Sequence, residues 1–272
     1  MDYIYYKVHY NDYRNEAGGE RMQPHIYEKK IKIPHYLGDR YRRITLPHLM
    51  SVLIEISGEQ TEEIGALSVR ELGLSWVIIQ YDFDIHRMPK TTETIRVRTY
   101  AREYNRIFTY REFEVYDEND NLIVYVMTVF ALIDTNRKLS KISPKIVEGY
   151  GSTENRRIKR MPKPEVPKNL EKAEHRRIQV GYFDIDTNFH ANNAMYFIWT
   201  LEALGDDFLS THEPVHGNIV FEKEVHIGEA VDSYSEIATN DEGQLISRHQ
   251  IQANDVIKCT GTFTWKETRT ED

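Results

Sequence analysis

The chain has 272 residues, a formal net charge of -8 at pH 7 and a single cysteine. This length is enough for one large domain or two modest ones, and the acidic balance argues against general nucleic-acid binding, which needs a broad basic surface. The lone Cys259 excludes an intramolecular disulfide framework and a cysteine-rich zinc site. No secretory leader and no run long enough to cross a bilayer is evident, so we expect a cytoplasmic protein without membrane insertion.

The first half of the chain predicts one helix among several strands. A strand and a polar loop fall within 28–39, and an apolar run predicts a helix from Leu46 to Gln60. Further strands are predicted near 76–86, 92–103, 106–117 and 122–134. Residues 117–121 are all Asp, Glu or Asn, which is typical of a hairpin turn between the last two strands.

A proline-containing basic stretch follows the first half. Residues 155–168 hold three prolines and little apolar content, which predicts an extended linker. A solvated connector is one interpretation. The other is a docking strip for an acidic partner, formed by Arg156, Arg157, Lys159, Arg160 and Lys163. We therefore divide the chain into an N-terminal domain at 1–150, a linker at 151–174 and a C-terminal domain at 175–272.

The second half repeats the pattern of the first. A helix is predicted near 193–208, with strands near 217–227, 231–240, 244–253 and 256–267. Residues 28–39 align without gaps on 175–186, and in that register Asp39 meets Asp186 and Gly58 meets Gly205. The matches keep the same order along both halves, which indicates a tandem duplication. Few intervals could hold a βαβ crossover, so we expect an α+β fold in which each copy curls an antiparallel sheet around one buried helix.

The richest polar motif lies just before the second helix. Alternation places Asp186, Asn188 and His190 on one side of an extended segment, and Asn192 and Asn193 are suitable caps for the helix that follows. An acid, an amide and an imidazole thus meet the positive end of a buried helix, where backbone N–H groups around the two caps would face a developing oxyanion. The motif predicts a catalytic site.

Residues 181–196, Gly-Tyr-Phe-Asp-Ile-Asp-Thr-Asn-Phe-His-Ala-Asn-Asn-Ala-Met-Tyr, resemble the signature of the acyl-acyl-carrier-protein thioesterases of plants and bacteria. The resemblance implies tandem hotdog domains, acyl carrier protein as partner, and hydrolysis of its fatty acyl thioester with no cofactor beyond the phosphopantetheine on the substrate. It makes Asp186, Asn188 and His190 active-site residues and adds Glu224 from the segment Lys223-Glu224. Plant members often have Cys after that Glu, whereas this chain has Val225.

Hydrolysis of a thioester needs an activated nucleophile and a stabilised oxyanion. No Ser lies in a Gly-x-Ser-x-Gly context and no loop exposes Cys259, so water is the expected nucleophile. His190 and Glu224 are both candidate bases, and the sequence does not decide between them. In the first copy Tyr41 and Arg43 replace Asn188 and His190. Since Arg cannot act as a base near neutral pH, we expect one site per chain.

The inactive first copy could instead hold the acyl chain. The candidate pocket residues come from the predicted helix and the next strand, and core packing is the alternative interpretation for all of them: Leu49, Met50, Leu53, Ile54, Trp76 and Ile78.

Other interpretations stay open at this point. A calcium loop fails because Phe189 and Met195 occupy the positions of the turn Gly and the bidentate Glu. An acyl-CoA thioesterase, a dehydratase or hydratase, and a non-catalytic acyl-binding protein are alternative functions. The short N-terminal segment suggests a bacterial-type protein with no plastid address. Chain-length preference and oligomeric state are left open, and a homodimer is compatible with the sequence.

Overall fold

The computed structural model describes residues 23–159 and 161–268. The first half contains β1 (Tyr27–Lys32), α2 (Leu46–Glu63), β2 (Leu74–Ile85), β3 (Thr94–Tyr104), β4 (Phe108–Tyr116) and β5 (Leu122–Asp134). The second contains β8 (Glu174–Gln179), α4 (Asn193–Glu202), α5 (Asp206–Thr211), β9 (His212–Phe221), β10 (Ala230–Thr239), β11 (Leu245–Ala253) and β12 (Val256–Glu267). Short elements complete them: η1 (His35–Leu37), η2 (Val69–Leu72), β6 (Leu139–Ser140), α3 (Pro144–Val147), η3 (Glu148–Tyr150), β7 (Thr153–Glu154) and η4 (Tyr182–Asp184).

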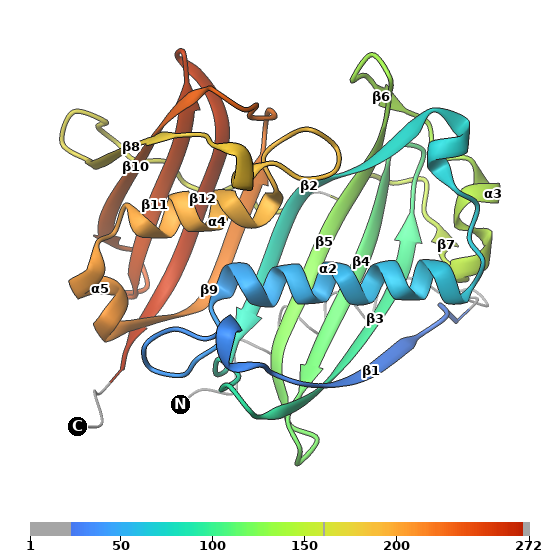
Figure 1. The fold of residues 1–272 in the computed structure, drawn as a ribbon, viewed down its shortest axis with the longest axis horizontal. Coiled ribbons are helices and arrows are strands. Elements are labelled where there is room, and N and C mark those ends of the chain that lie inside the picture. Colours follow the sequence, from blue (N-terminus) through green and yellow to red (C-terminus); the bar gives the residue numbers. More distant parts are fainter. Residues whose placement is uncertain (1–22, 160, 269–272) are drawn as a thin grey trace.

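All the long strands form one continuous sheet, with α2 and α4 lying across the same face (Figure 1). Its order is β1-β3-β4-β5-β2-β9-β12-β11-β10-β8, so each half repeats one strand order, and β2 joins β9 at the centre. Every pair along that path is antiparallel, while β7 pairs in parallel with β3 at the sheet's periphery. The predicted α+β fold is confirmed, and the repeated order agrees with a tandem duplication.

The helix α2 shows why each half needs a buried helix. Thr45 caps it by accepting a hydrogen bond from the His48 N–H through Oγ1, and Pro47 occupies its first turn, where a missing N–H costs little. Apolar residues recur every three or four positions on the face toward the sheet and are buried there: Leu46, Leu49, Met50, Leu53 and Ile56. Burying each of these side chains contributes about 1.5–3 kcal/mol before the entropy cost.

Two predicted elements in the second half are wrong in their bounds. The helix expected at 193–208 breaks into α4 and α5, because Gly205 adopts a left-handed conformation with φ of 83°. The strand expected at 217–227 is β9, which begins at His212 and ends at Phe221. Beyond it, the N–H groups of Glu222 and Lys223 both donate to the Lys258 carbonyl, which ends the ladder with β12. Glu224 therefore lies in a loop rather than in a strand.

The segment between the halves crosses the outer face of the sheet, opposite the helices. The Tyr110 hydroxyl donates to the Lys159 carbonyl at 3.2 Å. The Pro162 carbonyl accepts from Gln80 Nε2 at 2.6 Å and from Asn218 Nδ2 at 3.0 Å, and these two residues belong to the central strands β2 and β9. This segment is therefore not a free connector. We call its residues 155–159 and 161–168 the strap, because they are held against strands of both halves.

No helix among the described residues is long and apolar enough to cross a membrane. The N-terminal segment, on which the expectation about leader sequences rests, lies outside the described residues.

Candidate active site

The polar motif forms a tight loop between η4 and α4. The Asp186 N–H donates to the His190 carbonyl at 2.8 Å, and the Phe189 N–H donates to the Asp186 carbonyl at 3.0 Å. Phe189 has a left-handed φ of 67°, which lets the chain reverse there. Asp186 Oδ1 accepts from the Asn188 N–H at 2.7 Å. Asp186 thus orders the turn that carries Asn188 and His190.

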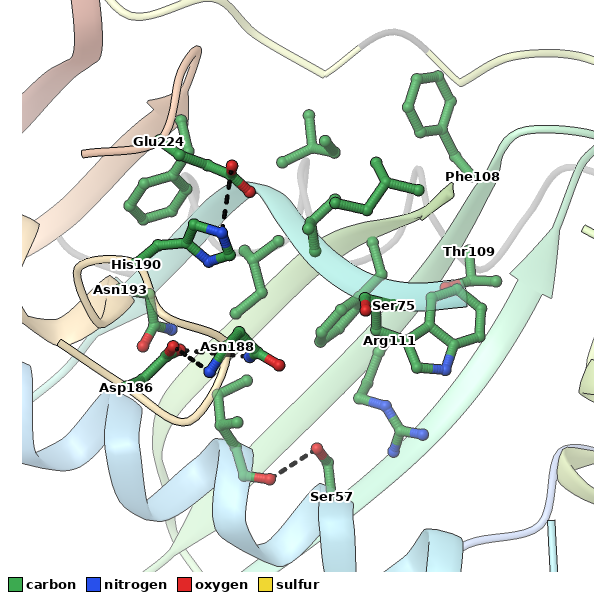
Figure 2. Close-up of a pocket in the computed structure, with 18 of the residues that line it drawn as sticks. Ser57, Ser75, Phe108, Thr109, Arg111, Asp186, Asn188, His190, Asn193 and Glu224 are labelled. Atoms are coloured by element: carbon green, nitrogen blue, oxygen red, sulfur yellow. Dashed lines mark hydrogen bonds and ion pairs between the residues drawn. The ribbon is translucent and has the colours of Figure 1, made fainter. Parts of the chain in front are cut away.

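His190 and Glu224 meet across this loop (Figure 2). Their Nε2 and Oε2 atoms are 3.4 Å apart, and their side chains are 15% and 32% exposed. The pairing follows from the backbone, because the Ala191 N–H donates to the Val225 carbonyl at 2.8 Å and so fixes the loop after β9 beside the motif. Two side chains 34 positions apart are brought together, as the motif and its downstream Glu predicted.

Two arginines from the first half complete the site. Arg137, in the turn after β5, donates through Nε to Glu224 Oε2 at 2.9 Å, and its Nη2 contacts the other carboxylate oxygen. Arg70 in η2 donates to Asn188 Oδ1 at 3.3 Å. Both contacts cross between the repeated halves. Neither contact could be predicted from the sequence, because nothing local to either arginine indicates a partner so distant in the chain.

The surroundings of His190 favour the neutral imidazole. Burial lowers the pKa of His190, the Arg137 guanidinium and His226 lower it further, and the Asp186 carboxylate opposes them. The rings of His190 and His226 lie 5.4 Å apart. A neutral imidazole near pH 7 can accept a proton, which a catalytic base requires.

The start of α4 supplies fewer free donors than expected. Asn192 caps the helix by accepting from the Ala194 N–H at 2.9 Å, while its own N–H donates to the Asp184 carbonyl at 2.8 Å. The expectation that the Asn192 N–H faces an oxyanion is therefore wrong. The Asn193 N–H has no acceptor among the described residues and remains available. Asn193 Nδ2 donates to the buried Tyr81 hydroxyl at 2.7 Å, which anchors the helix start to β2.

A cavity of about 850 Å³ runs from these residues into the first half. At one end it is lined by Asp186, Asn188, His190, Asn193 and Glu224, and Figure 2 shows Ser57 and Arg111 on the other side. One stripe of α2 lines the cavity at positions i, i+3, i+4 and i+7, namely Ile54, Ser57, Gly58 and Thr61. Small residues at three of these positions leave space between the helix and the sheet.

The predicted pocket residues divide into two groups. Ile54, Trp76 and Ile78 line the cavity. Leu49, Met50 and Leu53 do not; they are fully buried between α2 and the sheet, as the core-packing alternative predicted. Leu49 and Leu53 lie on the neighbouring face of α2, whereas Met50 lies one turn before Ile54 on the same stripe, so the cavity ends between Met50 and Ile54.

Two family models together cover most of the chain. The acyl-ACP thioesterase N-terminal domain matches residues 24–150, and the acyl-ACP thioesterase C-terminal domain matches residues 167–267. The chain belongs to the acyl-ACP thioesterase family. Its two halves are therefore the two hotdog domains of that family.

Known relatives support this membership at low identity. A solved structure from Lactobacillus plantarum, provisionally assigned as an oleoyl thioesterase, is 31% identical, with a TM-score of 0.87 over 91% of this chain and 98% of that one. A 12:0-ACP thioesterase from Umbellularia californica shares the fold, with 18% identity and a TM-score of 0.80 over 89% and 94% of the two chains. The chloroplastic oleoyl-acyl carrier protein thioesterase of Coriandrum sativum is 24% identical over 76% of this chain and 61% of its own. The chain spans about three fifths of the length of such curated relatives.

The basic residues that the sequence suggested as a docking strip belong to the strap. Arg156, Arg157 and Lys163 are exposed there, and Lys159 lies 3.9 Å from Glu103. Arg160 lies outside the described residues. Because the strap follows the outer face of the sheet, these cations lie across the sheet from the helices. The exposed cations at the cavity itself are Arg137 and Lys223.

The remaining chemistry of the described residues is limited. Cys259 is buried, and burial raises the pKa of its thiol. Within 23–159 and 161–268, no group of three or more His, Cys, Asp or Glu side chains is arranged to hold a metal ion.

Proposed function

We propose that the protein hydrolyses the thioester of fatty acyl-acyl carrier protein with an activated water and releases free fatty acid and holo-carrier protein. The observation that carries this proposal is the single cavity that connects the His190–Glu224 pair to a largely apolar chamber in the first half. A thioester carbonyl placed beside the pair would leave its acyl chain in the chamber. Family membership supports the same reaction.

We assign the base to His190, acting together with Glu224. The neutral imidazole takes a proton from water while the water oxygen attacks the carbonyl carbon. The Glu224 side chain, which Arg137 holds in place, lies beside the imidazole, where a carboxylate stabilises the imidazolium that forms. The tetrahedral oxyanion accepts from the Asn193 N–H at the positive end of α4. The carbon–sulfur bond then breaks, and the departing thiolate takes the proton from His190.

Asp186 and Asn188 hold the geometry of this step. Asp186 accepts from the Asn188 N–H, and Asn188 Nδ2 lies 3.4 Å from Asp186 Oδ2. Arg70 holds the amide oxygen of Asn188 from the other half. The amide is therefore fixed at the cavity lining, where it can position the water or the thioester carbonyl.

We propose that the carrier protein docks at the cavity mouth rather than on the strap. The mouth offers the exposed cations Arg137 and Lys223, with Arg70 nearby, and the adjoining loop exposes the aromatic rings of Phe183 and Phe189. An acidic partner with a thioester-bearing arm needs such cations within reach of the catalytic residues. A cytoplasmic location remains part of the proposal.

Thiol release from a panel of acyl-carrier-protein and acyl-CoA thioesters tests the proposal. We expect turnover of the carrier-protein substrates by the wild type and its loss in His190→Ala. A strict preference for CoA substrates would make the protein an acyl-CoA thioesterase. No turnover of any thioester by the folded protein would contradict hydrolysis and favour a hydratase or an acyl-binding protein.

A further inference from the structure

Arg111 is a buried cation in the wall of the cavity, and the described residues provide it with no anionic partner. It lies on β4 on the side of the cavity opposite His190 and Glu224 (Figure 2), and it is only 7% exposed. No acidic side chain among the described residues forms an ion pair with it. Burial lowers the pKa of Arg111 to about 10, so the guanidinium remains charged at neutral pH. Buried charges in proteins are normally paired, because an isolated one is costly.

One edge of the guanidinium forms no hydrogen bond within the part of the chain that the structure describes. Nη1 donates to Gln60 Oε1 at 2.5 Å and to Thr99 Oγ1 at 3.0 Å, and the ring of Tyr150 lies 5.3 Å from the guanidinium carbon. An arginine has five N–H donors, and the three on Nε and Nη2 have no acceptor among the described residues. The Nε and Nη2 edge is one on which a carboxylate binds with two parallel hydrogen bonds.

The fold itself does not require a charge at this position. In β11 the residue with the matching ladder neighbours is His249: Arg111 lies opposite Ala101 and Thr128, and His249 lies opposite Ser235 and Gly261. His249 is buried, and burial lowers its pKa to about 3, so it is neutral. The second half of the protein, which contains His249, therefore keeps this position uncharged. Only the half with the cavity places a cation there.

The hydroxyl groups of Thr61 and Tyr150, near Arg111, are already hydrogen-bonded within the protein. Thr61 Oγ1 donates to the Ser57 carbonyl at 3.0 Å, and the Tyr150 hydroxyl lies 2.8 Å from Thr61 Oγ1. These hydroxyls bond to α2 and to one another, and their hydrogens do not reach outward. Ser75 and Thr109 also line this part of the cavity with neutral hydroxyls, so Arg111 supplies the charged donors there. A ligand must therefore bring acceptors.

We propose that the cavity accepts acyl chains that carry a carboxylate at their far end, held by the Nε and Nη2 edge of Arg111. The inference rests on the proposed function and names its substrate class: half-thioesters of dicarboxylic acids. A terminal methyl placed against Arg111 would leave three donors and a charge without partners. A terminal hydroxyl supplies one acceptor and no charge, whereas a carboxylate supplies two acceptors and neutralises the guanidinium.

The test compares three series of acyl thioesters of matched chain length, with a methyl, a hydroxyl or a carboxylate at the far end. In the wild type, we expect kcat/KM for the carboxylate series to exceed that of the methyl series by about 10–100-fold at the best length, as expected for a charged hydrogen bond. Arg111→Met should reverse the preference. Arg111→Lys, which keeps the charge but loses the planar edge, should retain part of it.

Arg98→Met is the matched control. Arg98 lies on the neighbouring strand β3 and pairs with Glu114 on the outer face, away from the cavity. The Arg98→Met variant should leave unchanged the ratio of kcat/KM between the carboxylate and methyl series. Thermal unfolding of each variant shows whether it is folded. A wild type that prefers methyl-ended chains at every length, with a ratio that Arg111→Met does not change, would overturn the inference.

The outcome separates this inference from the proposed function. If methyl-ended thioesters are hydrolysed and Arg111→Met does not change the ratio of kcat/KM between the carboxylate and methyl series, the proposed hydrolysis is supported and the carboxylate site is contradicted. If no thioester is hydrolysed, calorimetric binding of amide analogues with either chain end still tests Arg111. Tighter binding of the carboxylate analogue, lost in Arg111→Met, supports the site, and equal binding of both analogues contradicts it.

Discussion

The two polar loops of the molecule, 35–45 and 182–192, share one backbone and differ in what their side chains do. The bridge between Gly38 and Ile44 in the first recurs between residues 185 and 191 in the second, 147 positions later. Arg42 and Phe189 occupy the same left-handed position, with φ of 63° and 67°. In each loop the N–H of the Asp donates to the carbonyl four residues on at 2.8 Å.

The position of Arg43 and His190 shows most clearly how the chemistry of this shared frame changes. In the first loop Arg43 donates to Asp39 at 2.9 Å and to Glu213 of the other half at 3.0 Å, which closes the loop with ion pairs. In the second, His190 leaves Asp186 to hold the turn and faces Glu224 instead. One backbone thus serves as an interdomain clamp or as a candidate catalytic loop, according to the side chains that it carries.

The interiors of the two halves differ in the same way. The cavity stripe of α2 includes Ser57 and Thr61, and the residues 147 positions later are Leu204 and Phe208. Leu204 is buried in the core, and Phe208 packs edge-on against Trp265 with ring centroids 5.1 Å apart. Large apolar side chains fill in one half the space that small polar ones leave open in the other. A tandem duplication could therefore divide the work, with reaction groups in one copy and the chamber in the other.

The largest expected effect comes from replacing His190 in the second loop, compared with the same replacement of Arg43 in the first. We expect His190→Gln to lower kcat for thioester hydrolysis by about 100–10,000-fold, because it removes the proposed base. Arg43→Gln at the equivalent position should leave kcat within a few-fold of wild type. Steady-state thiol release measures both. Equal losses in the two variants would show that the loops contribute alike and would contradict a single site.

Filling the cavity should produce the next largest effect. Ser57→Leu combined with Thr61→Phe gives α2 the side chains found 147 positions later, Leu204 and Phe208, so long acyl chains lose their space. We expect kcat/KM for the longest substrates to fall about 10–200-fold, the range for a few misplaced methylenes, while short chains remain substrates. The chain-length profile measures this. An unchanged profile would place the acyl chain elsewhere, and Ile56→Leu, a core change on another face of α2, is the control.

The sequence could predict the parts of this comparison that are local. The spacing of Asp186, Asn188 and His190, the gapless repeat and the segment carrying Glu224 are all readable in the chain, and the fold followed from them. The bounds of β9 were missed because the Glu222 and Lys223 N–H groups share one carbonyl, a contact with β12 that no local pattern signals.

A pocket in the first half could be predicted, but not which apolar residues line it or which contacts join the two halves. Leu53 and Ile54 are adjacent apolar residues, yet one packs in the core and the other lines the chamber. Only the packing of α2 against the sheet separates them. Arg70 and Arg137 join the site across the duplication, and a pairing between distant loops requires the folded arrangement of both halves.

The clamp in the first loop should appear in stability rather than in catalysis. Arg43→Gln leaves Asp39 and Glu213 close together and poorly exposed, without their cation. We expect a loss of about 1–3 kcal/mol in the free energy of unfolding, the cost of unpairing partly buried polar groups. Urea unfolding measures it. Arg40→Gln, whose partner Asp206 is well exposed, is the control and should cost less than about 1 kcal/mol.

The pH dependence of kcat/KM tests how Arg137 acts on His190. Its charge lowers the pKa of His190, so in Arg137→Gln that pKa should rise, and the imidazole should become protonated at a higher pH. The acid limb of the kcat/KM profile then moves to higher pH, and activity below neutral pH falls relative to activity above it. Lys138→Gln, an adjacent exposed cation, should leave the limb in place. A limb that stays or moves to lower pH would remove His190 from the role of base.

The smallest expected effect separates the strap from the mouth as the docking surface. Charge reversal of Lys223 should raise KM for a carrier-protein substrate several-fold at low salt, because it removes attraction at the point where the acyl arm enters. Reversal of Lys163 on the strap should change KM by less, since the sheet lies between it and the helices. Both effects should shrink as salt is added, and neither variant should change turnover of an uncharged small thioester. A larger KM effect from Lys163 would return the docking site to the strap, with the acidic carrier then spanning the outer face while its arm reaches around the sheet.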